Sequence, residues 1–251
     1  MEYVAILRAR RILTWYAVVF SALVALGLAL AFKDGPPRVQ MAHDQNPTIP
    51  LDALVVGSMF APVILAAFFA VGLDAEHKTI AIAWTRPLAR LSIAARYVAV
   101  AFLGMFSAWL FTVAVGVLTL LILGLLQYVA PGQQSWKHLP AMAGVAVMWY
   151  GLVVFVSALL PGRGNAVAGA SWAYALIVPG LTQMPFPPLV HQVTVALDYL
   201  NPLMYLQSHG AREGEVVFAY GGGAVLAIAW AIGIVCTAAG AYLWATRDAK
   251  A

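Results

Sequence analysis

Charged residues are scarce in this chain of 251 residues. Only 14 Lys and Arg and 10 Asp and Glu are present, so 10% of the residues are charged while 63% are hydrophobic. A soluble domain carries about 25% charged residues and about 45–50% apolar ones, and it uses the charged residues to cover its surface. The composition excludes a soluble domain. It also excludes a soluble enzyme held by a single anchor, because too little polar sequence remains outside the apolar stretches.

Residue types that build metal sites and catalytic sites are also sparse. Cys236 is the single cysteine, which excludes an internal disulfide and a cysteine-rich metal or iron–sulfur site. No two histidines have the spacing of metal ligands, and no Gly-x-Ser-x-Gly motif is present. The five histidines occupy five different loop regions: His43, His77, His138, His191 and His209. We therefore assign no catalytic residue and no metal ligand.

One segment comes close to a phosphate-binding loop. Residues 72–79 match that pattern except at His77, which replaces the second glycine. The loop directs backbone N–H groups at phosphates after a β-strand, whereas this segment follows an apolar run and carries Asp74 and Glu76, which repel phosphate. We interpret the match as a coincidence. If the protein uses nucleotide energy, ATP and Mg²⁺ bind to another subunit, and this chain has no cofactor of its own.

Long apolar runs are abundant. A helical crossing needs about 20 apolar residues. Six runs satisfy this length: residues 12–32, 51–73, 97–126, 140–160, 166–184 and 216–244. Their cores lack Asp, Glu, Lys, Arg and His, and their apolar character is continuous rather than alternating, which favours helices over barrel strands. We predict an all-α polytopic membrane protein, a single domain over residues 1–251 with six transmembrane helices.

The first run also has features of a signal peptide. Arg8, Arg10 and Arg11 precede it, and residues 29–31 (Ala-Leu-Ala) resemble a cleavage site. A signal peptide has an apolar region of about 7–15 residues, and this run is longer, which favours a retained span.

Basic residues indicate the orientation of the six spans. Six spans place both termini on one side, and that side holds ten basic residues against four on the other. The four are Lys33, Arg38, Lys137 and Arg212. By the positive-inside rule both termini are cytoplasmic, so we predict a multi-pass protein of the cell membrane, such as a bacterial inner or plasma membrane. The net charge of +4 reports this orientation and does not indicate a nucleic-acid partner.

The external segments differ in character. Residues 33–50 contain four prolines and read as an extended loop. Within residues 185–215, the stretch 189–200 places Val193, Leu197 and Leu200 at helical spacing, and Asn201-Pro202 ends it. This pattern predicts a short amphipathic helix, which either lies at or dips into the outer leaflet, or packs against the bundle.

The cytoplasmic loop over residues 74–96 is the most distinctive polar segment. Asp74 is suited to the start of a short helix, and Pro87 disfavours helical geometry at Arg86 and so marks its end. Pro87 also suits the first turn of a second helix that leads into the third span. The alternative is a basic loop that follows the positive-inside rule and contacts lipid phosphates.

A resemblance to a known family bears on this choice. The residues Phe-Ala-Pro-Val-Ile-Leu at 60–65, followed by Glu-His-Lys-Thr-Ile-Ala-Ile-Ala-Trp-Thr-Arg-Pro-Leu-Ala-Arg at 76–90, resemble the permease subunits of type-2 ABC exporters. Glu76, Thr79, Arg90 and Arg96 stand where that family has its Glu, its Thr and its basic residues. Lys78 replaces the usual glycine, and Ala89 replaces the hydroxyl residue before the arginine.

The resemblance implies a fold, a docking element and partners. It implies the six-span exporter fold, a cytoplasmic interfacial helix over residues 1–11, and a coupling helix that docks on an ATP-binding subunit. The residues that it assigns to coupling are Glu76, Thr79, Trp84, Arg86 and Arg90. The implied partners are an ABC ATP-binding subunit, a second permease copy or paralogue, and the lipid bilayer.

We therefore expect a permease subunit of an ATP-driven exporter rather than an enzyme. Spans without buried charge suit a lipophilic or amphiphilic cargo, such as a drug, an antibiotic or a lipid-like molecule. They disfavour a proton-coupled carrier, although a sodium site built from backbone carbonyls escapes this argument. The alternatives are a secondary transporter or channel, and a membrane-embedded enzyme with an interfacial site around His191 and Asp198.

Overall fold

The computed structural model describes residues 2–33, 49–75, 87–130, 139–206 and 223–246, and most of these residues are helical. Within them, five helical segments are long and apolar enough to cross a membrane. These are Val4–Ala31, Leu54–Ala75, Arg90–Ile122, Leu139–Leu159 and Ala227–Thr246. The prediction of a mostly helical chain with several helices long and apolar enough to cross a membrane is confirmed.

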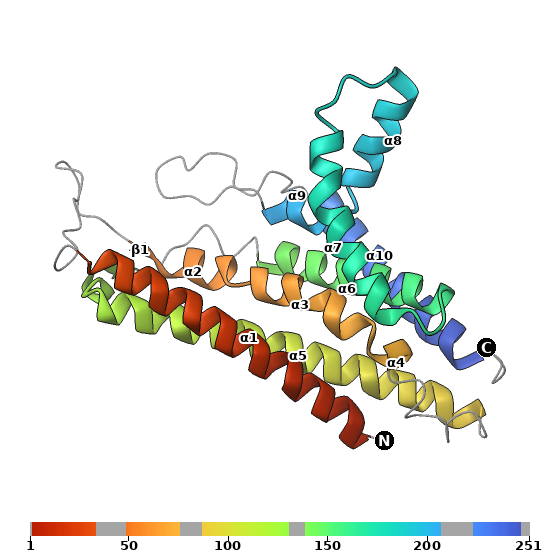
Figure 1. Cartoon of the computed structure of the whole chain (residues 1–251), viewed down its shortest axis with the longest axis horizontal. Helices are drawn as coiled ribbons and strands as arrows, with labels where there is room; N and C mark the ends of the chain where they lie inside the picture. The colour runs from red at the N-terminus through yellow and green to blue at the C-terminus, as the bar shows by residue number, and fades with distance from the viewer. Residues whose placement is uncertain (1, 34–48, 76–86, 131–138, 207–222, 247–251) are drawn as a thin grey trace.

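The two longest helices, α1 (Glu2–Ala31) and α5 (Pro87–Ile122), lie side by side along the bundle (Figure 1). Helix α1 is continuous, so the predicted interfacial helix over residues 1–11 and the first span form one helix without a break. Helix α5 begins at Pro87, as predicted, and so starts well before the expected third span. The Tyr16 hydroxyl joins the two helices through a 2.7 Å hydrogen bond with Thr112 Oγ1.

The second predicted span is broken into α2 (Leu51–Gly57), α3 (Phe60–Ala70) and α4 (Gly72–Ala75). Pro62 explains the first break. It has no N–H for the carbonyl of Ser58, and its ring clashes with that carbonyl in a regular helix. The N–H of Ala61 donates to the Ser58 carbonyl instead, at 3.2 Å.

Helices α6 (Leu139–Leu159) and α10 (Gly223–Thr246) run parallel and pack backbone against backbone. A Cβ on Gly151 would lie 2.3 Å from the Gly233 carbonyl oxygen, and one on Gly233 would lie 2.6 Å from the carbonyl carbon of Val147. Seven residues further along α10, a Cβ on Gly240 would lie 3.0 Å from the Phe155 backbone. Glycine at these positions allows an approach that any other residue would block.

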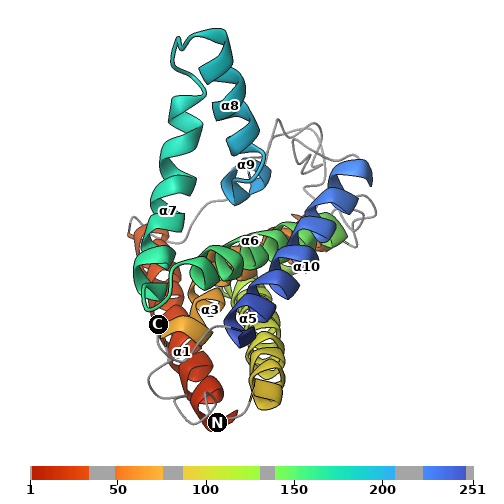
Figure 2. The ribbon, with the colours of Figure 1, turned by 90° about the vertical axis from the view of Figure 1, so that its right-hand side faces the viewer.

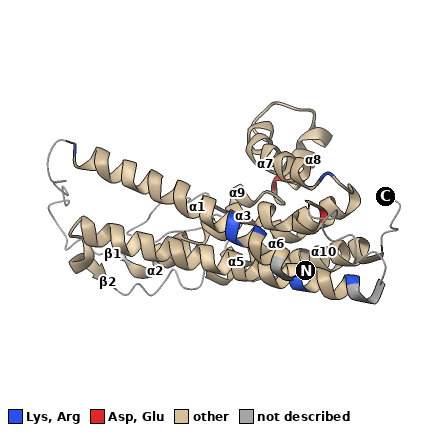
Figure 3. Cartoon of the chain, turned by 60° about the horizontal axis from the view of Figure 1, so that its bottom comes forward, with Lys and Arg blue, Asp and Glu red and all other residues tan. Residues whose placement is uncertain are grey.

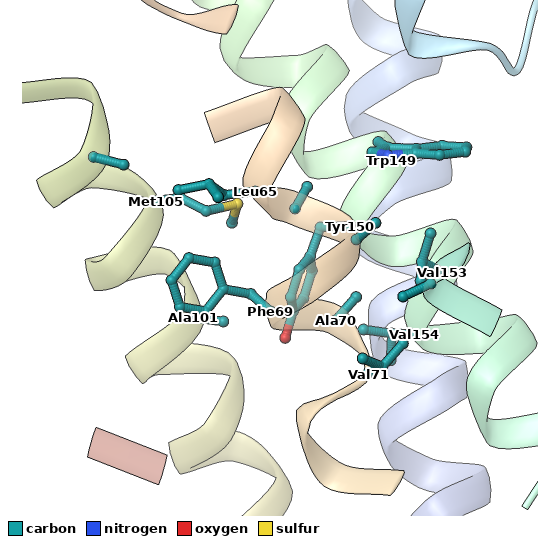
Figure 4. Packing of buried hydrophobic residues seen from close by; sticks show 14 of the residues in the cluster. Leu65, Phe69, Ala70, Val71, Ala101, Met105, Trp149, Tyr150, Val153 and Val154 are labelled. Atoms are coloured by element: carbon teal, nitrogen blue, oxygen red, sulfur yellow. The ribbon is translucent and has the colours of Figure 1, made fainter. Parts of the chain in front are cut away.

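The hydrophobic core lies where α3, α5, α6 and α7 meet. Figure 4 shows Phe69 of α3 between α5, where Ala101 and Met105 lie, and Tyr150 of α6. Phe69 packs over Gly104 of α5, where a Cβ would lie 2.5 Å from its ring. Small residues on α5 therefore admit a large ring from α3.

Helices α7 (Gly164–Leu181), α8 (Pro188–Asp198) and α9 (Pro202–Leu206) form a hairpin that rises away from the other helices (Figures 1 and 2). Helix α7 covers most of the predicted fifth span, residues 166–184, but it is not among the five apolar segments within the described residues. Polar residues such as Asn165 and Ser171 lower its apolarity.

Helix α8 confirms the predicted short helix, and Asn201 follows its end as expected. Its Leu189 is 74% exposed and its Val193 is 52% exposed, whereas Thr194 and Asp198 are buried. Leu189 and Val193 are exposed, whereas Leu197 lines a cavity together with Trp149 of α6, so only the C-terminal end of α8 faces the bundle. Helix α9, which starts directly at Pro202, was not predicted.

A minimal sheet departs from the all-α prediction. Strand β1 (Ile49–Pro50) pairs in parallel with β2 (Val129–Ala130), which follows the short 3₁₀ helix η2 (Leu126–Tyr128). The pair joins the segment before α2 to the segment after α5. At the opposite end of the bundle lie the start of α1, the start of α5 and the end of α10 (Figure 1).

Candidate functional site

Most of the predicted coupling residues lie outside the described part of the chain. Residues 76–86 hold Glu76, Thr79, Trp84 and Arg86, and with them the predicted short helix. Arg90 is described, and it is half-buried near the start of α5. The structure therefore defines the two helices that enter and leave the predicted coupling segment, α4 and α5.

Asp74, the penultimate residue of α4, is buried and contacts a different part of the chain from the one predicted. One carboxylate oxygen accepts a 2.9 Å hydrogen bond from the N–H of Gly162, and the other accepts a 2.7 Å bond from the N–H of Gly164. Gly164 is the first residue of α7, so the carboxylate lies at the N-terminus of that helix, where negative charge is favourable. The helix that we expected Asp74 to cap lies outside the described residues; within them, Asp74 joins its loop to α7.

Local backbone geometry makes this contact possible. Gly162 has φ of 74°, a left-handed conformation that glycine adopts without steric cost. A Cβ on Gly164 would lie 3.2 Å from Asp74 Oδ2 and 3.2 Å from the Val71 carbonyl oxygen. The Gly-Arg-Gly sequence at 162–164 is a signal for a tight turn, but nothing in the sequence indicates that its partner is Asp74.

Arg8 brings α1 to the same region. Its Nη2 donates to the Phe68 carbonyl at 3.4 Å, and its side chain lies beside Gly72 at the start of α4. Helices α1, α3, α4 and α7 thus converge next to the predicted coupling segment.

A groove of about 900 Å³ runs along α1 from this junction. Helix α3 forms the opposite wall through Ile64, Leu65 and Phe68, and Asn165 of α7 also lines the groove. The residues of α1 that line it are Val4, Leu7, Arg8, Arg11, Ile12, Trp15, Tyr16 and Val19. Trp15 is 64% exposed and Phe68 is 42% exposed, so the groove is open along one side.

The groove is charged in one part and apolar in the rest. Arg8 and Arg11 lie between the apolar Val4 and Leu7 on one side and a longer wall from Ile12 to Val19, which is apolar and aromatic, on the other. Arg8 and Arg11 line the groove, and Arg10 does not. Figure 3 shows how sparse the charges are elsewhere on the described helices.

A second, smaller cavity of about 310 Å³ lies between α6, α7 and α8. Trp149 and Tyr174 line it, with their rings stacked at 6.2 Å between centroids. The remaining lining is almost entirely aliphatic. This cavity lacks a charged side chain among its lining residues, which makes it a less specific candidate than the groove along α1.

The polar residues of the hairpin hold it together. Asn201 is fully buried, and its Nδ2 donates to the Ala175 carbonyl at 3.0 Å and to Asp198 Oδ1 at 3.1 Å. Pro179, four residues after Ala175, has no N–H for that carbonyl, so Asn201 supplies the missing donor. His191 and Asp198, which the enzymatic alternative invokes, lie two turns apart on α8; His191 is exposed, whereas Asp198 is buried and accepts a hydrogen bond from Asn201.

Comparison with known proteins finds no matching family model, no similar curated protein and no similar solved structure.

Proposed function

We propose that the chain is the transmembrane permease subunit of an ATP-driven ABC exporter that moves a lipophilic or amphiphilic cargo out of the cytoplasm. In this proposal it has six spans, with α7 as the fifth, and both termini in the cytoplasm of a cell membrane. It pairs with a second permease copy or paralogue, and a separate subunit hydrolyses ATP.

The bond between Asp74 and the N-terminus of α7 is the observation that carries the proposal. The predicted docking segment follows Asp74 directly in the sequence. A displacement of that segment by an ATP-binding subunit would pull on α4, and through two hydrogen bonds on α7. Helix α7 carries Asn165, which lines the groove along α1. The two Asp74 hydrogen bonds would thus transmit a movement of the predicted docking segment to helix α7, which lines a cavity large enough for a cargo.

Copurification with an ATP-binding subunit tests the docking role. The first step is to ask whether a neighbouring coding sequence encodes an ATPase of the ABC type, and to coexpress the two chains. We expect a stable complex that is lost with Glu76→Ala or Arg90→Glu and kept with Lys33→Glu, a charge reversal at the other end of α1. Each variant must elute as a monodisperse species.

Two outcomes would overturn the proposal. One is full transport activity by this chain reconstituted alone, which would indicate a secondary transporter or channel. The other is loss of function on substituting His191 and Asp198 while Glu76 and Arg90 variants stay active, which would indicate an interfacial enzyme.

The orientation has its own test. In a variant with Cys236→Ser, single cysteines are placed at Thr79 and Arg163, and at Lys33 as the opposite control. An impermeant thiol reagent added outside intact cells is expected to label only the cysteine at position 33. External labelling at position 79 or 163 would contradict the proposed topology.

A further inference from the structure

The groove along α1 has the charge and shape to hold one kind of molecule. Arg8 and Arg11 are three residues apart, and Ile12, Trp15 and Val19 continue the same face of the helix at helical spacing. At 1.5 Å per residue, the wall from Arg11 to Val19 is about 12 Å long, and from Val4 to Val19 it is about 22 Å long. A cationic part followed by a long apolar wall complements an anionic head group with a hydrocarbon tail.

The two arginines have different surroundings. Arg8 is tied to α3 through the Phe68 carbonyl and packs beside Gly72. Arg11 is exposed and lines the groove from one turn further along. Its guanidinium presents a planar set of donors that matches a phosphate, and Asn165, the second residue of α7, also lines the groove.

The open side of the groove gives such a molecule a route of entry. Trp15 and Phe68 are exposed along it, and both belong to candidate membrane-spanning segments. A tail could therefore enter sideways from the bilayer without crossing an aqueous phase. A soluble anion would match only the arginines and would leave the apolar wall uncovered.

We propose that this groove binds an anionic, phosphate-bearing lipid amphiphile, with its head group on Arg11 and Asn165 and its tail along Ile12, Trp15 and Val19. We further propose that the transported cargo belongs to this class of amphiphile, and this step rests on the proposed function. The binding site itself does not, because it uses only residues of this chain.

The test measures binding to the full chain alone, in nanodiscs of phosphatidylcholine, with no ATP-binding subunit present. A phosphatidylglycerol with a fluorescent tail is titrated in, and a phosphatidylcholine with the same tail is the neutral comparison. We expect Arg11→Gln to weaken phosphatidylglycerol binding about tenfold and to leave the neutral lipid unaffected. Arg10→Gln makes the same charge change on an adjacent exposed residue outside the groove, and we expect it to change binding by less than about twofold.

A second pair of variants tests the tail without changing charge. Val19→Trp fills the apolar part of the groove, and Val18→Trp places the same ring on the neighbouring exposed residue. We expect only Val19→Trp to displace the fluorescent lipid. Glycerol phosphate, the head group without a tail, is expected not to compete at the concentrations where the lipid binds.

Three results would overturn the inference. They are equal losses for Arg10→Gln and Arg11→Gln, equal binding of the neutral lipid, and competition by glycerol phosphate at lipid-like concentrations. These results are independent of the copurification assay. A chain that binds the lipid but no ATPase keeps this site and loses the permease assignment, and the reverse result keeps the permease and loses the site.

Discussion

Two regions of this molecule are held together in opposite ways. Helices α6 and α10 meet backbone to backbone at Gly151 and Gly233, with no room for a Cβ between them. The hairpin of α7, α8 and α9 leaves Leu176 69% exposed and Leu189 74% exposed, and it depends on a few polar bonds. Resistance to local opening follows from the density of packed contacts. The α6–α10 pair is therefore the rigid frame, and the hairpin is the part that can rearrange with low cost.

The same substitution in the two regions gives the sharpest contrast. Gly233→Ala places a methyl group 2.6 Å from the α6 backbone, so we expect a loss of about 3 kcal/mol, at the upper end for overpacking. Gly169→Ala in α7 meets no atom within 4 Å, and the gain in helix propensity is about 0.5–1 kcal/mol. Thermal unfolding followed by size exclusion in detergent measures both. Equal effects at the two glycines would erase the distinction between frame and hairpin.

The base of the hairpin gives the next largest effect. Asp74→Ala removes the acceptor for the N–H groups of Gly162 and Gly164, and we expect a loss of about 2 kcal/mol. Asp74→Asn keeps one acceptor oxygen and is expected to lose less. Hydrogen exchange of the first turn of α7 should increase in the alanine variant, while α6 and α10 stay protected. An increase spread over all helices would instead mean that Asp74 supports the whole bundle.

The buried amide of Asn201 tests the junction between α7 and the α8–α9 turn. Asn201→Ala leaves the Ala175 carbonyl without its donor and the N–H of Leu203 without its acceptor, so we expect a loss of about 1–2 kcal/mol. Gln192→Ala removes an exposed amide from α8 and serves as the matched control. Limited proteolysis should cut near α8 and α9 sooner in the first variant only. Unchanged cleavage would show that Asn201 is not what holds the hairpin.

The smallest effect is expected for a single hydroxyl. The Tyr174 hydroxyl donates to the Leu197 carbonyl and so links α7 to α8. We expect Tyr174→Phe to cost about 0.5–1 kcal/mol, because the bond is partly exposed to solvent. Tyr242→Phe on the exposed face of α10 should be neutral. A thermal shift for Tyr174→Phe as large as that of Asn201→Ala would mean that the hydroxyl, rather than the amide, closes the hairpin.

Local features of the sequence predicted the helices well. Continuous apolar runs located most of the long helices, Pro87 marked the start of α5, and Asn201-Pro202 marked the end of α8. The break between α2 and α3 also has a local cause, Pro62, although we predicted a single continuous span over residues 51–73. These features succeed because each depends on the conformational limits of one residue or on the length of a run.

Contacts between distant segments could not be predicted in this way. Asp74 and Gly164 are far apart in the chain, and a carboxylate after an apolar helix is compatible with many partners. The close pair of Gly151 and Gly233 could not be predicted either, because small residues are so abundant in this chain that their spacing singles out no particular interface. Pairing of this kind is decided by the packing of whole helices.

The hydrogen bond from Asn201 to the Ala175 carbonyl affects how the hairpin assembles during synthesis. Pro179 leaves the Ala175 carbonyl without a donor inside α7, and Asn201, which reaches it, is synthesised 26 residues later. In a bilayer an unsatisfied carbonyl costs several kcal/mol. If α7 is the fifth span, as proposed above, it lacks this hydrogen bond until Asn201 has emerged from the ribosome. In that case we expect α7, α8 and α9 to insert as one unit, held near the membrane surface until all three have been made.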